Sequence, residues 1–244
     1  IGGGGYVGPR YLKQAYPESE VTVVEIDPAV TKIVQDRLGL RQDSDIEIIH
    51  EDARQYLAKL DKNKKFDFIF ADAFNDLSVP YHLTTSEFVD LIKAHLSEDG
   101  VYAANIIDSY DEGRFSSSFV KTLREHFEYV YLMPTTKEWQ EAARATFVVV
   151  GSDEDLIYLT RPAQRAEAPS PTLGEGGNSL ADVKLPVEMQ DWDELDDEAR
   201  DDLVYIVPEG ELEEYLEERE GIVLTDDFVP VESMLAPVFA GKAI

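Results

Sequence analysis

The chain has 244 residues, of which 43% are hydrophobic, and its 50 acidic residues outnumber 22 basic ones to give a formal net charge of −28. A surface this negative repels phosphate backbones and anionic lipids, which argues against nucleic-acid binding and peripheral membrane binding. Because there is no cysteine and the four histidines are scattered, we expect no disulfide and no metal site. No apolar run approaches the roughly 20 residues that cross a bilayer, and we expect a cytoplasmic protein.

Short β-branched runs alternate with amphipathic stretches through the first part of the chain. The predicted strands are residues 21–26, 46–50, 66–71, 101–107, 129–133 and 146–150. The predicted helices are residues 9–16, 28–38, 53–60, 85–96 and 114–127. Two of these helices have conventional start signals, which are Pro28 in a first turn and Thr84 or Thr85 with Glu87 at an N-cap.

This alternation predicts an α/β fold of the Rossmann-like, nucleotide-binding type. Strands that are apolar along nearly their whole length indicate a mostly parallel, twisted sheet with helices on both faces. The last two strands, 129–133 and 146–150, have no good helix between them. We therefore expect them to form an antiparallel hairpin at one edge of the sheet.

Composition divides the chain into three parts. Residues 1–160 form the predicted Rossmann-like domain, and residues 161–180 read as a linker or surface loop because they are rich in Ala, Pro, Gly, Ser and Glu. Residues 181–244 form a more acidic extension, predicted to pack on the main domain. Since a glycine-rich loop normally follows a buried strand, the opening Ile1-Gly2 predicts that the first strand of the domain is truncated here.

A glycine run and an acidic residue point to a nucleoside site. Gly2, Gly3, Gly4 and Gly5 precede a predicted helix, so backbone amides can approach a ligand at the start of that helix. Some 20 residues later, Glu25 ends the next strand, where a carboxylate in a doubly wound sheet can accept both ribose hydroxyls. The alternative for Glu25 is an ordinary strand-end acid in solvent.

Two further strand ends carry acids. Asp52, followed by Ala53, comes after the strand at 46–50 and either accepts a hydrogen bond from an adenine amino group or caps the next helix. Asp72 follows the strand at 66–71, at the crevice where ligands bind in open α/β sheets. Together with the glycine loop and Glu25, these acids resemble the adenosyl site of a class I methyltransferase fold.

The resemblance becomes narrower in three segments. The run Phe-Ala-Asp-Ala-Phe-Asn-Asp at 70–76, its continuation at 79–88 and the ending Leu-Thr-Asp-Asp-Phe-Val-Pro-Val-Glu at 224–232 resemble the spermidine synthase family of polyamine aminopropyltransferases. They are most similar to the divergent branch that is often fused behind membrane segments. The resemblance implies a homodimer, and tethering to membrane segments that this chain does not contain.

The resemblance also implies a reaction and roles for residues. The donor is decarboxylated S-adenosylmethionine, whose aminopropyl carbon is attacked by an amine such as putrescine. Asp72 takes the role of general base and cation anchor, with Asp76 as a second catalytic acid. Asn75, Tyr81 and His82 are expected to line the amine site. No metal is needed.

One departure leaves the donor open. Gly5 stands where spermidine synthases usually carry the acid that grips the aminopropyl nitrogen of the donor. An S-adenosylmethionine-dependent methyltransferase on the same fold is therefore the first alternative. The second is a nucleoside-binding domain without catalysis.

Overall fold

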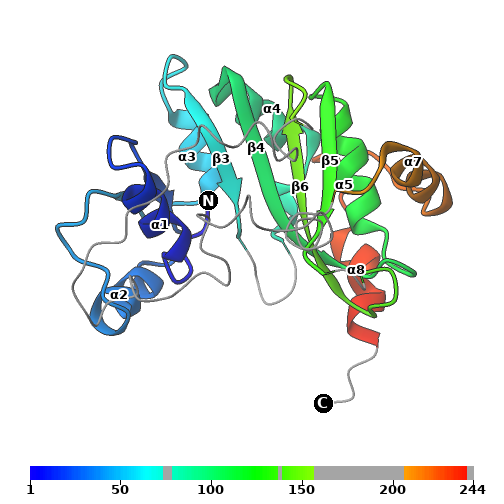
Figure 1. Cartoon of the computed structure of the whole chain (residues 1–244), viewed down its shortest axis with the longest axis horizontal. Coiled ribbons are helices and arrows are strands. Elements are labelled where there is room, and N and C mark those ends of the chain that lie inside the picture. The colour runs from blue at the N-terminus through cyan, green and yellow to red at the C-terminus, as the bar shows by residue number, and fades with distance from the viewer. Residues whose placement is uncertain (74–78, 137–138, 157–205, 241–244) are drawn as a thin grey trace, which may run out of the picture. The chain divides into compact units, whose positions relative to one another are not determined.

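The computed structural model describes residues 1–73, 79–136, 139–156 and 206–240 (Figure 1). These residues fall into two compact units. Unit 1 comprises Ile1–Tyr56, and unit 2 comprises the described parts of Leu57–Leu156 together with residues 206–240. The predicted linker at 161–180 lies outside the described residues, so the division of the chain at 160 and 180 stays a prediction.

Unit 1 alternates helices and strands in the predicted order. It contains α1 (Val7–Ala15), β1 (Thr22–Val24), α2 (Pro28–Arg37) and β2 (Glu47–Ile49), and it holds the start of α3 (Ala53–Lys59), which ends in unit 2. The strands β1 and β2 pair in parallel. The helix α2 starts where the sequence predicts, because Pro28 occupies its first turn and the Asp27 carboxylate accepts a hydrogen bond from the Ala29 N–H at 2.8 Å.

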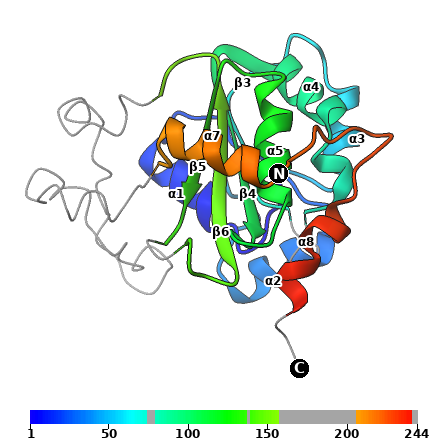
Figure 2. The same cartoon turned by 90° about the vertical axis from the view of Figure 1, so that its right-hand side faces the viewer.

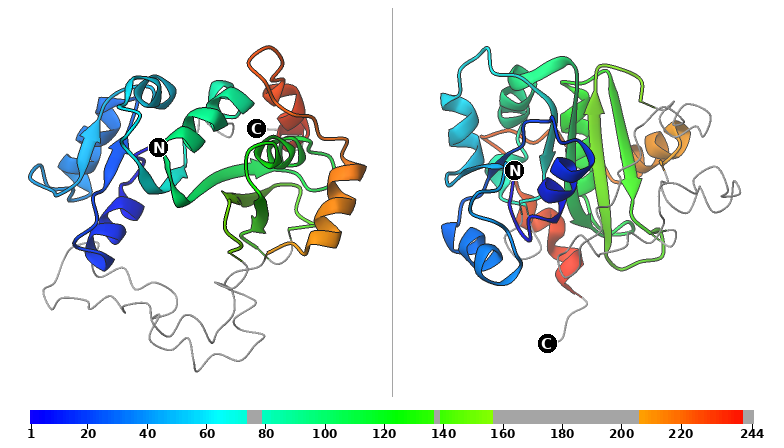
Figure 3. Two further views of the ribbon diagram at one scale, coloured as in Figure 1. Left: turned by 90° about the horizontal axis from the view of Figure 1, so that it is seen from above. Right: turned by 60° about the vertical axis from the view of Figure 1, so that its left-hand side comes forward.

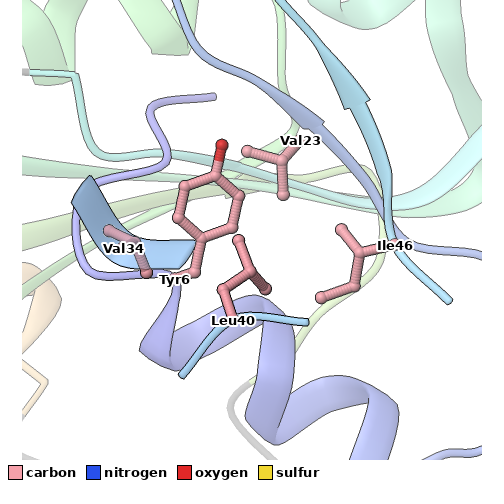
Figure 4. Packing of buried hydrophobic residues seen from close by; sticks show 5 residues of the cluster. All are labelled: Tyr6, Val23, Val34, Leu40 and Ile46. Carbon is pink, nitrogen blue, oxygen red and sulfur yellow. The ribbon is translucent and has the colours of Figure 1, made fainter. Parts of the chain in front are cut away.

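The core of unit 1 is small and includes one residue of the glycine loop. Figure 4 shows its five buried side chains turned toward one another, namely Tyr6, Val23, Val34, Leu40 and Ile46. They come from the loop, from β1 and α2, and from the segment that leads into β2. The tyrosine ring therefore joins the loop to the packing of the strand and the helix that follow it.

Unit 2 is built on a four-stranded mixed sheet. Its elements are β3 (Phe66–Ala71), the 3₁₀ turn η1 (Tyr81–Leu83), α4 (Ser86–His95), β4 (Leu96–Asp108), α5 (Phe115–Arg124), β5 (Tyr129–Pro134), β6 (Ala145–Ser152), α7 (Glu209–Glu218) and α8 (Val231–Ala240). The strand order is β3-β4-β6-β5 (Figure 1). β3 and β4 pair in parallel, whereas β6 is antiparallel to both β4 and β5.

The α/β class and the antiparallel hairpin at the edge are confirmed. The pairing differs from a mostly parallel sheet, since the described strands form two sheets with two parallel and two antiparallel pairings. The short connection from β5 to β6 explains the antiparallel part, because a parallel return needs a longer crossover. Within β3, Phe68 and Phe70 are 48% and 39% exposed.

The C-terminal segment packs on α4 and α5. Figures 2 and 3 show α7, in orange, beside α5. Two threonine hydroxyl groups bind the segment that follows α7. The Leu224 N–H donates to Thr122 Oγ1 at 2.9 Å, and Thr85 Oγ1 donates to Asp226 Oδ1 at 2.8 Å. Thr85 is also the predicted N-cap of α4, accepting from the Phe88 N–H at 3.3 Å. The tail thus joins two helices far from it in sequence.

The described residues contain neither a membrane-spanning helix nor a metal-binding cluster. No helix in them is both long and apolar enough to span a bilayer. Within the same ranges, no group of three or more His, Cys, Asp or Glu side chains is placed to hold a metal ion.

Candidate active site

The glycine loop is fixed to the end of β1. The Gly2 N–H donates to the Val24 carbonyl at 2.8 Å, and Gly2 and Gly4 have φ angles of 86° and 46°, in the left-handed region that favours glycine. Gly3 is buried, and a Cβ there would lie 2.6 Å from the ring of Tyr6. A side chain would therefore strain the backbone at positions 2 and 4, and at position 3 it would clash with the ring of Tyr6.

Tyr6 holds the glycine loop against the core of unit 1. Its φ of 55° is unusual for a bulky residue, and its side chain is fully buried. Its hydroxyl lies 2.6 Å from Thr31 Oγ1, which lies 2.9 Å from Nε2 of His50. Burial raises the pKa of the Tyr6 hydroxyl. This chain of hydrogen bonds was not predicted, although a large aromatic residue inside a glycine run was the available signal.

Glu25 is buried and bound by two backbone amides. Its carboxylate accepts from the Gly3 N–H at 2.7 Å and from the Asp27 N–H at 2.9 Å, one on each oxygen, and the residue is 7% exposed. Glu25 is thus not a strand-end acid in solvent. Each carboxylate oxygen can accept a second hydrogen bond, so the two amides leave acceptor capacity for a ligand.

Two apolar side chains of unit 1 are largely exposed. Ile26 is 69% exposed and Val7, the first residue of α1, is 61% exposed. Because water-exposed apolar side chains gain by being covered, these two residues offer surface to a flat ring. Neither residue was predicted from the sequence to belong to the site.

Asp52 caps α3. Its Oδ1 accepts from the Gln55 N–H at 3.0 Å, and its carbonyl accepts from the Tyr56 N–H at 2.9 Å. One carboxylate oxygen of Asp52 therefore caps the helix, as the alternative interpretation predicted. The contact with an adenine amino group stays a prediction. Ala53, the first residue of α3, is buried.

In unit 2, Asp72 directly follows β3 and lies beside Asn105 of β4. The register pairs Ala71 with Ala104, which places the next residue of each strand side by side. Asn105 Nδ2 donates to Asp72 Oδ1 at 2.9 Å. The other end of that amide, Oδ1, is buried and has no hydrogen-bond partner among the described residues. A buried acceptor without a donor is costly, and an exposed carboxylate lies next to it.

The remaining predicted substrate residues divide into two groups. Tyr81 and His82 lie on η1, with their rings 5.6 Å apart and nearly perpendicular, and Tyr81 is 61% exposed. Asn75 and Asp76 lie outside the described residues. The predicted site residues that the structure describes belong to both units. Unit 1 holds the glycine loop, Glu25, Asp52 and Ala53, and unit 2 holds Asp72, Tyr81 and His82.

These features define a class. A glycine loop at a helix start, tied to a buried acid at the next strand end, and an acid following a parallel strand belong to a Rossmann-like fold of the class I methyltransferase type. The spermine/spermidine synthase domain model matches residues 1–153. The chain therefore belongs to the spermine/spermidine synthase family.

The chain is similar to individual aminopropyltransferases and also to a methyltransferase. A polyamine aminopropyltransferase of Vibrio vulnificus is 41% identical over 106 residues, which are 43% of this chain and 36% of that protein. The N-terminal histidine N-methyltransferase of Emericella nidulans is 31% identical over 128 residues, covering 51% of this chain and 21% of that one. The crystal structure of a probable spermidine synthase from Corynebacterium glutamicum superposes with a TM-score of 0.57 at 27% identity, over 64% of this chain and 56% of that one. The chain thus spans about a third or less of the length of these two curated relatives.

Proposed function

We propose that this chain carries the catalytic core of an aminopropyltransferase, which moves an aminopropyl group from decarboxylated S-adenosylmethionine to an amine such as putrescine. The observation that carries the proposal is the pair of acceptors on β3 and β4: the Asp72 carboxylate and the unpartnered Asn105 Oδ1. An amine that approaches as an ammonium ion can donate N–H groups to Asn105 Oδ1, which has no donor, and to the Asp72 carboxylate, which already accepts one bond from Asn105 Nδ2 and can accept more. Family membership supports the choice of reaction.

The proposed chemistry needs one proton acceptor. The amine arrives protonated, and loss of one proton to the Asp72 carboxylate frees the lone pair on its nitrogen. That nitrogen forms a bond to the aminopropyl carbon while the bond from this carbon to sulfur breaks, and sulfur keeps the electron pair. The products are the extended amine and methylthioadenosine.

We assign the nucleoside to unit 1. The free acceptor capacity of Glu25 would bind the ribose hydroxyls, and the exposed side chain of Ile26 would pack against the base. Gly2, Gly3 and Gly4 would keep the loop backbone close to the ligand. The adenine contact of Asp52, the roles of Tyr81 and His82, the homodimer, the membrane tether and the cytoplasmic location stay predictions.

A methyltransferase with S-adenosylmethionine as donor is the second candidate, and the residue at position 5 favours it. Without an acid at Gly5, the loop has no carboxylate for the aminopropyl nitrogen of the decarboxylated donor. A Cβ at Gly5 meets only Val7 Cγ2, at 3.6 Å, so an aspartate can be introduced without a steric clash. Binding of the two donors by wild-type protein and by Gly5→Asp, measured by calorimetry, separates the candidates: an aminopropyltransferase prefers the decarboxylated donor, and Gly5→Asp strengthens that preference.

The role of Asp72 is tested by Asp72→Asn. We expect the rate of methylthioadenosine formation, measured by chromatography, to fall by about 100-fold or more, while nucleoside affinity stays within about twofold of the wild type. Asp67→Asn, at the other end of β3, removes the same charge from an exposed site and serves as the control. Unchanged turnover in Asp72→Asn would refute the general-base role. Nucleoside binding without turnover in the wild-type chain would instead support the non-catalytic alternative.

A further inference from the structure

Unit 2 contains a cleft of about 420 Å³ that shares no residue with the pair Asp72 and Asn105. It is formed by the segment after β4, the connection from β5 to β6, and α7. The residues that determine its chemistry are Tyr110, Trp139, Tyr215, Glu211, Glu214 and Glu218. Its volume lies within the range of small-molecule sites.

Three aromatic rings form one wall of the cleft. Tyr110 stacks on Tyr215 with ring centres 5.1 Å apart and planes 11° apart, and Trp139 meets Tyr110 edge-on at 4.6 Å. Tyr215 and Trp139 are 2% and 4% exposed, and the Tyr215 hydroxyl lies 2.5 Å from Ser116 Oγ. The rings are therefore fixed before any ligand arrives, which lowers the entropy cost of binding.

Three carboxylates line the cleft from α7. Glu211, Glu214 and Glu218 follow the spacing of one helix face and extend over about 10 Å along the helix axis. Like charges at this spacing destabilise a helix. Arg124 neutralises two other glutamates of α7, Glu209 and Glu213, at 2.9 and 2.6 Å, and does not line the cleft.

The cleft already borders one cation. The guanidinium carbon of Arg219 lies 5.4 Å from the ring centre of Tyr110 and 5.9 Å from that of Tyr215, within the range of a cation–π interaction. Charges on Glu218 and Glu211 add to burial in raising the pKa of Tyr110. Set against the three lining glutamates, one arginine leaves a negative surface above the rings.

We propose that this cleft binds an organic cation with two or more ammonium groups linked by short alkyl chains, as a second site independent of the transfer reaction. The alkyl chain covers the exposed part of Tyr110, whose ring is held by the buried Tyr215 and Trp139, while the ammonium groups lie at Glu211, Glu214 and Glu218. A hydrated inorganic cation gains nothing from the aromatic wall, and a single ammonium group uses only one of the three carboxylates. The distribution of charge along α7 therefore favours an oligoamine.

The test is a calorimetric titration of the Asp72→Asn chain with spermidine as the probe, in about 0.15 M salt, where charges on the surface are screened beyond about 8 Å. Asp72→Asn is used so that the proposed substrate site contributes little. We expect saturable binding that Glu214→Gln weakens about 10-fold, the loss of one charge-assisted contact. Tyr110→Leu should weaken it to a similar extent, whereas Tyr110→Phe, which keeps the ring, should bind like the parent.

The control is Glu217→Gln, an equal change of charge on the same helix at an exposed residue outside the cleft. Its spermidine affinity should stay within about twofold of the parent. Equal weakening by Glu214→Gln and Glu217→Gln would overturn the proposal, because it would mean attraction to the net charge alone. Saturable binding of Mg²⁺ at the cleft, or no saturable binding of spermidine, would overturn it as well. Turnover of Glu214→Gln with Asp72 intact should equal that of the wild type, so failure here is distinguishable from failure of the proposed transfer reaction.

Discussion

Replacement of Glu25 by glutamine tests the link between β1 and the glycine loop. The wild-type carboxylate accepts from the Gly3 N–H at 2.7 Å and the Asp27 N–H at 2.9 Å in a site that is 7% exposed. Glutamine keeps one acceptor oxygen, but its NH₂ group faces the other amide N–H. One charge-assisted hydrogen bond is lost and a donor is left without an acceptor, which costs about 1.5–3 kcal/mol.

Amide hydrogen exchange measures this cost locally. If the loss falls on the local opening of the loop, the amide of Gly3 or of Asp27 should exchange about 10- to 150-fold faster in Glu25→Gln than in the wild type. Glu18→Gln makes the same charge change at an exposed residue of unit 1 and should leave both amides unchanged. If both amides exchanged in Glu25→Gln at the same rate as in the wild type, the proposed contribution of the Glu25 hydrogen bonds would be refuted. Nucleoside affinity should also fall, and an unchanged affinity would limit Glu25 to positioning the loop.

Two further predictions concern folding. Gly3→Ala places a Cβ 2.6 Å from the fully buried Tyr6 ring and should lower the unfolding free energy by about 1–3 kcal/mol in urea denaturation, whereas Gly5→Ala should be nearly neutral; equal effects would contradict the packing argument. Burial raises the pKa of Asp108, so the folded state holds the proton of this carboxyl group more tightly than the unfolded state does. The protonated carboxyl group therefore contributes to the stability of the fold. This contribution is full below about pH 3.9 and is lost as the pH rises through the folded-state pKa. Asp108→Asn removes the titration, so its stability should vary less with pH above about pH 4 than that of the wild type, and parallel curves would contradict the prediction.

Much of the secondary structure follows from local sequence signals. The predicted strand at 66–71 has the same bounds as β3, and the starts of α2 and α4 follow from Pro28 and Thr85 as predicted. β4, by contrast, begins at Leu96 and not at residue 101 as predicted. The prediction missed this start because the first residues of β4 are mostly polar and show no strand pattern. Periodicity and helix caps involve only a few neighbouring residues, so predictions based on them depend little on the tertiary structure.

Parts of the candidate site were predicted and others were not. Glu25 was identified because the distance from a glycine loop to the next strand end is nearly constant in such folds. Asn105 was not, since an asparagine in an apolar run has no local signal, and its contact with Asp72 depends on the register between β3 and β4. Tyr6 was not predicted as a structural residue, although its ring belongs to the buried cluster of unit 1.

Short motifs and their spacing are enough to predict the α/β class, the order of the elements, the family and the acids at the strand ends. Two arrangements become visible only in the folded chain: the acceptor oxygen of Asn105 lies buried beside Asp72, and Tyr110 and Tyr215 stack to form a cleft with the glutamates of α7. Both arrangements join residues tens of positions or more apart in the chain. Their geometry is set by strand register and helix docking, which depend on many weak contacts acting together rather than on any local pattern.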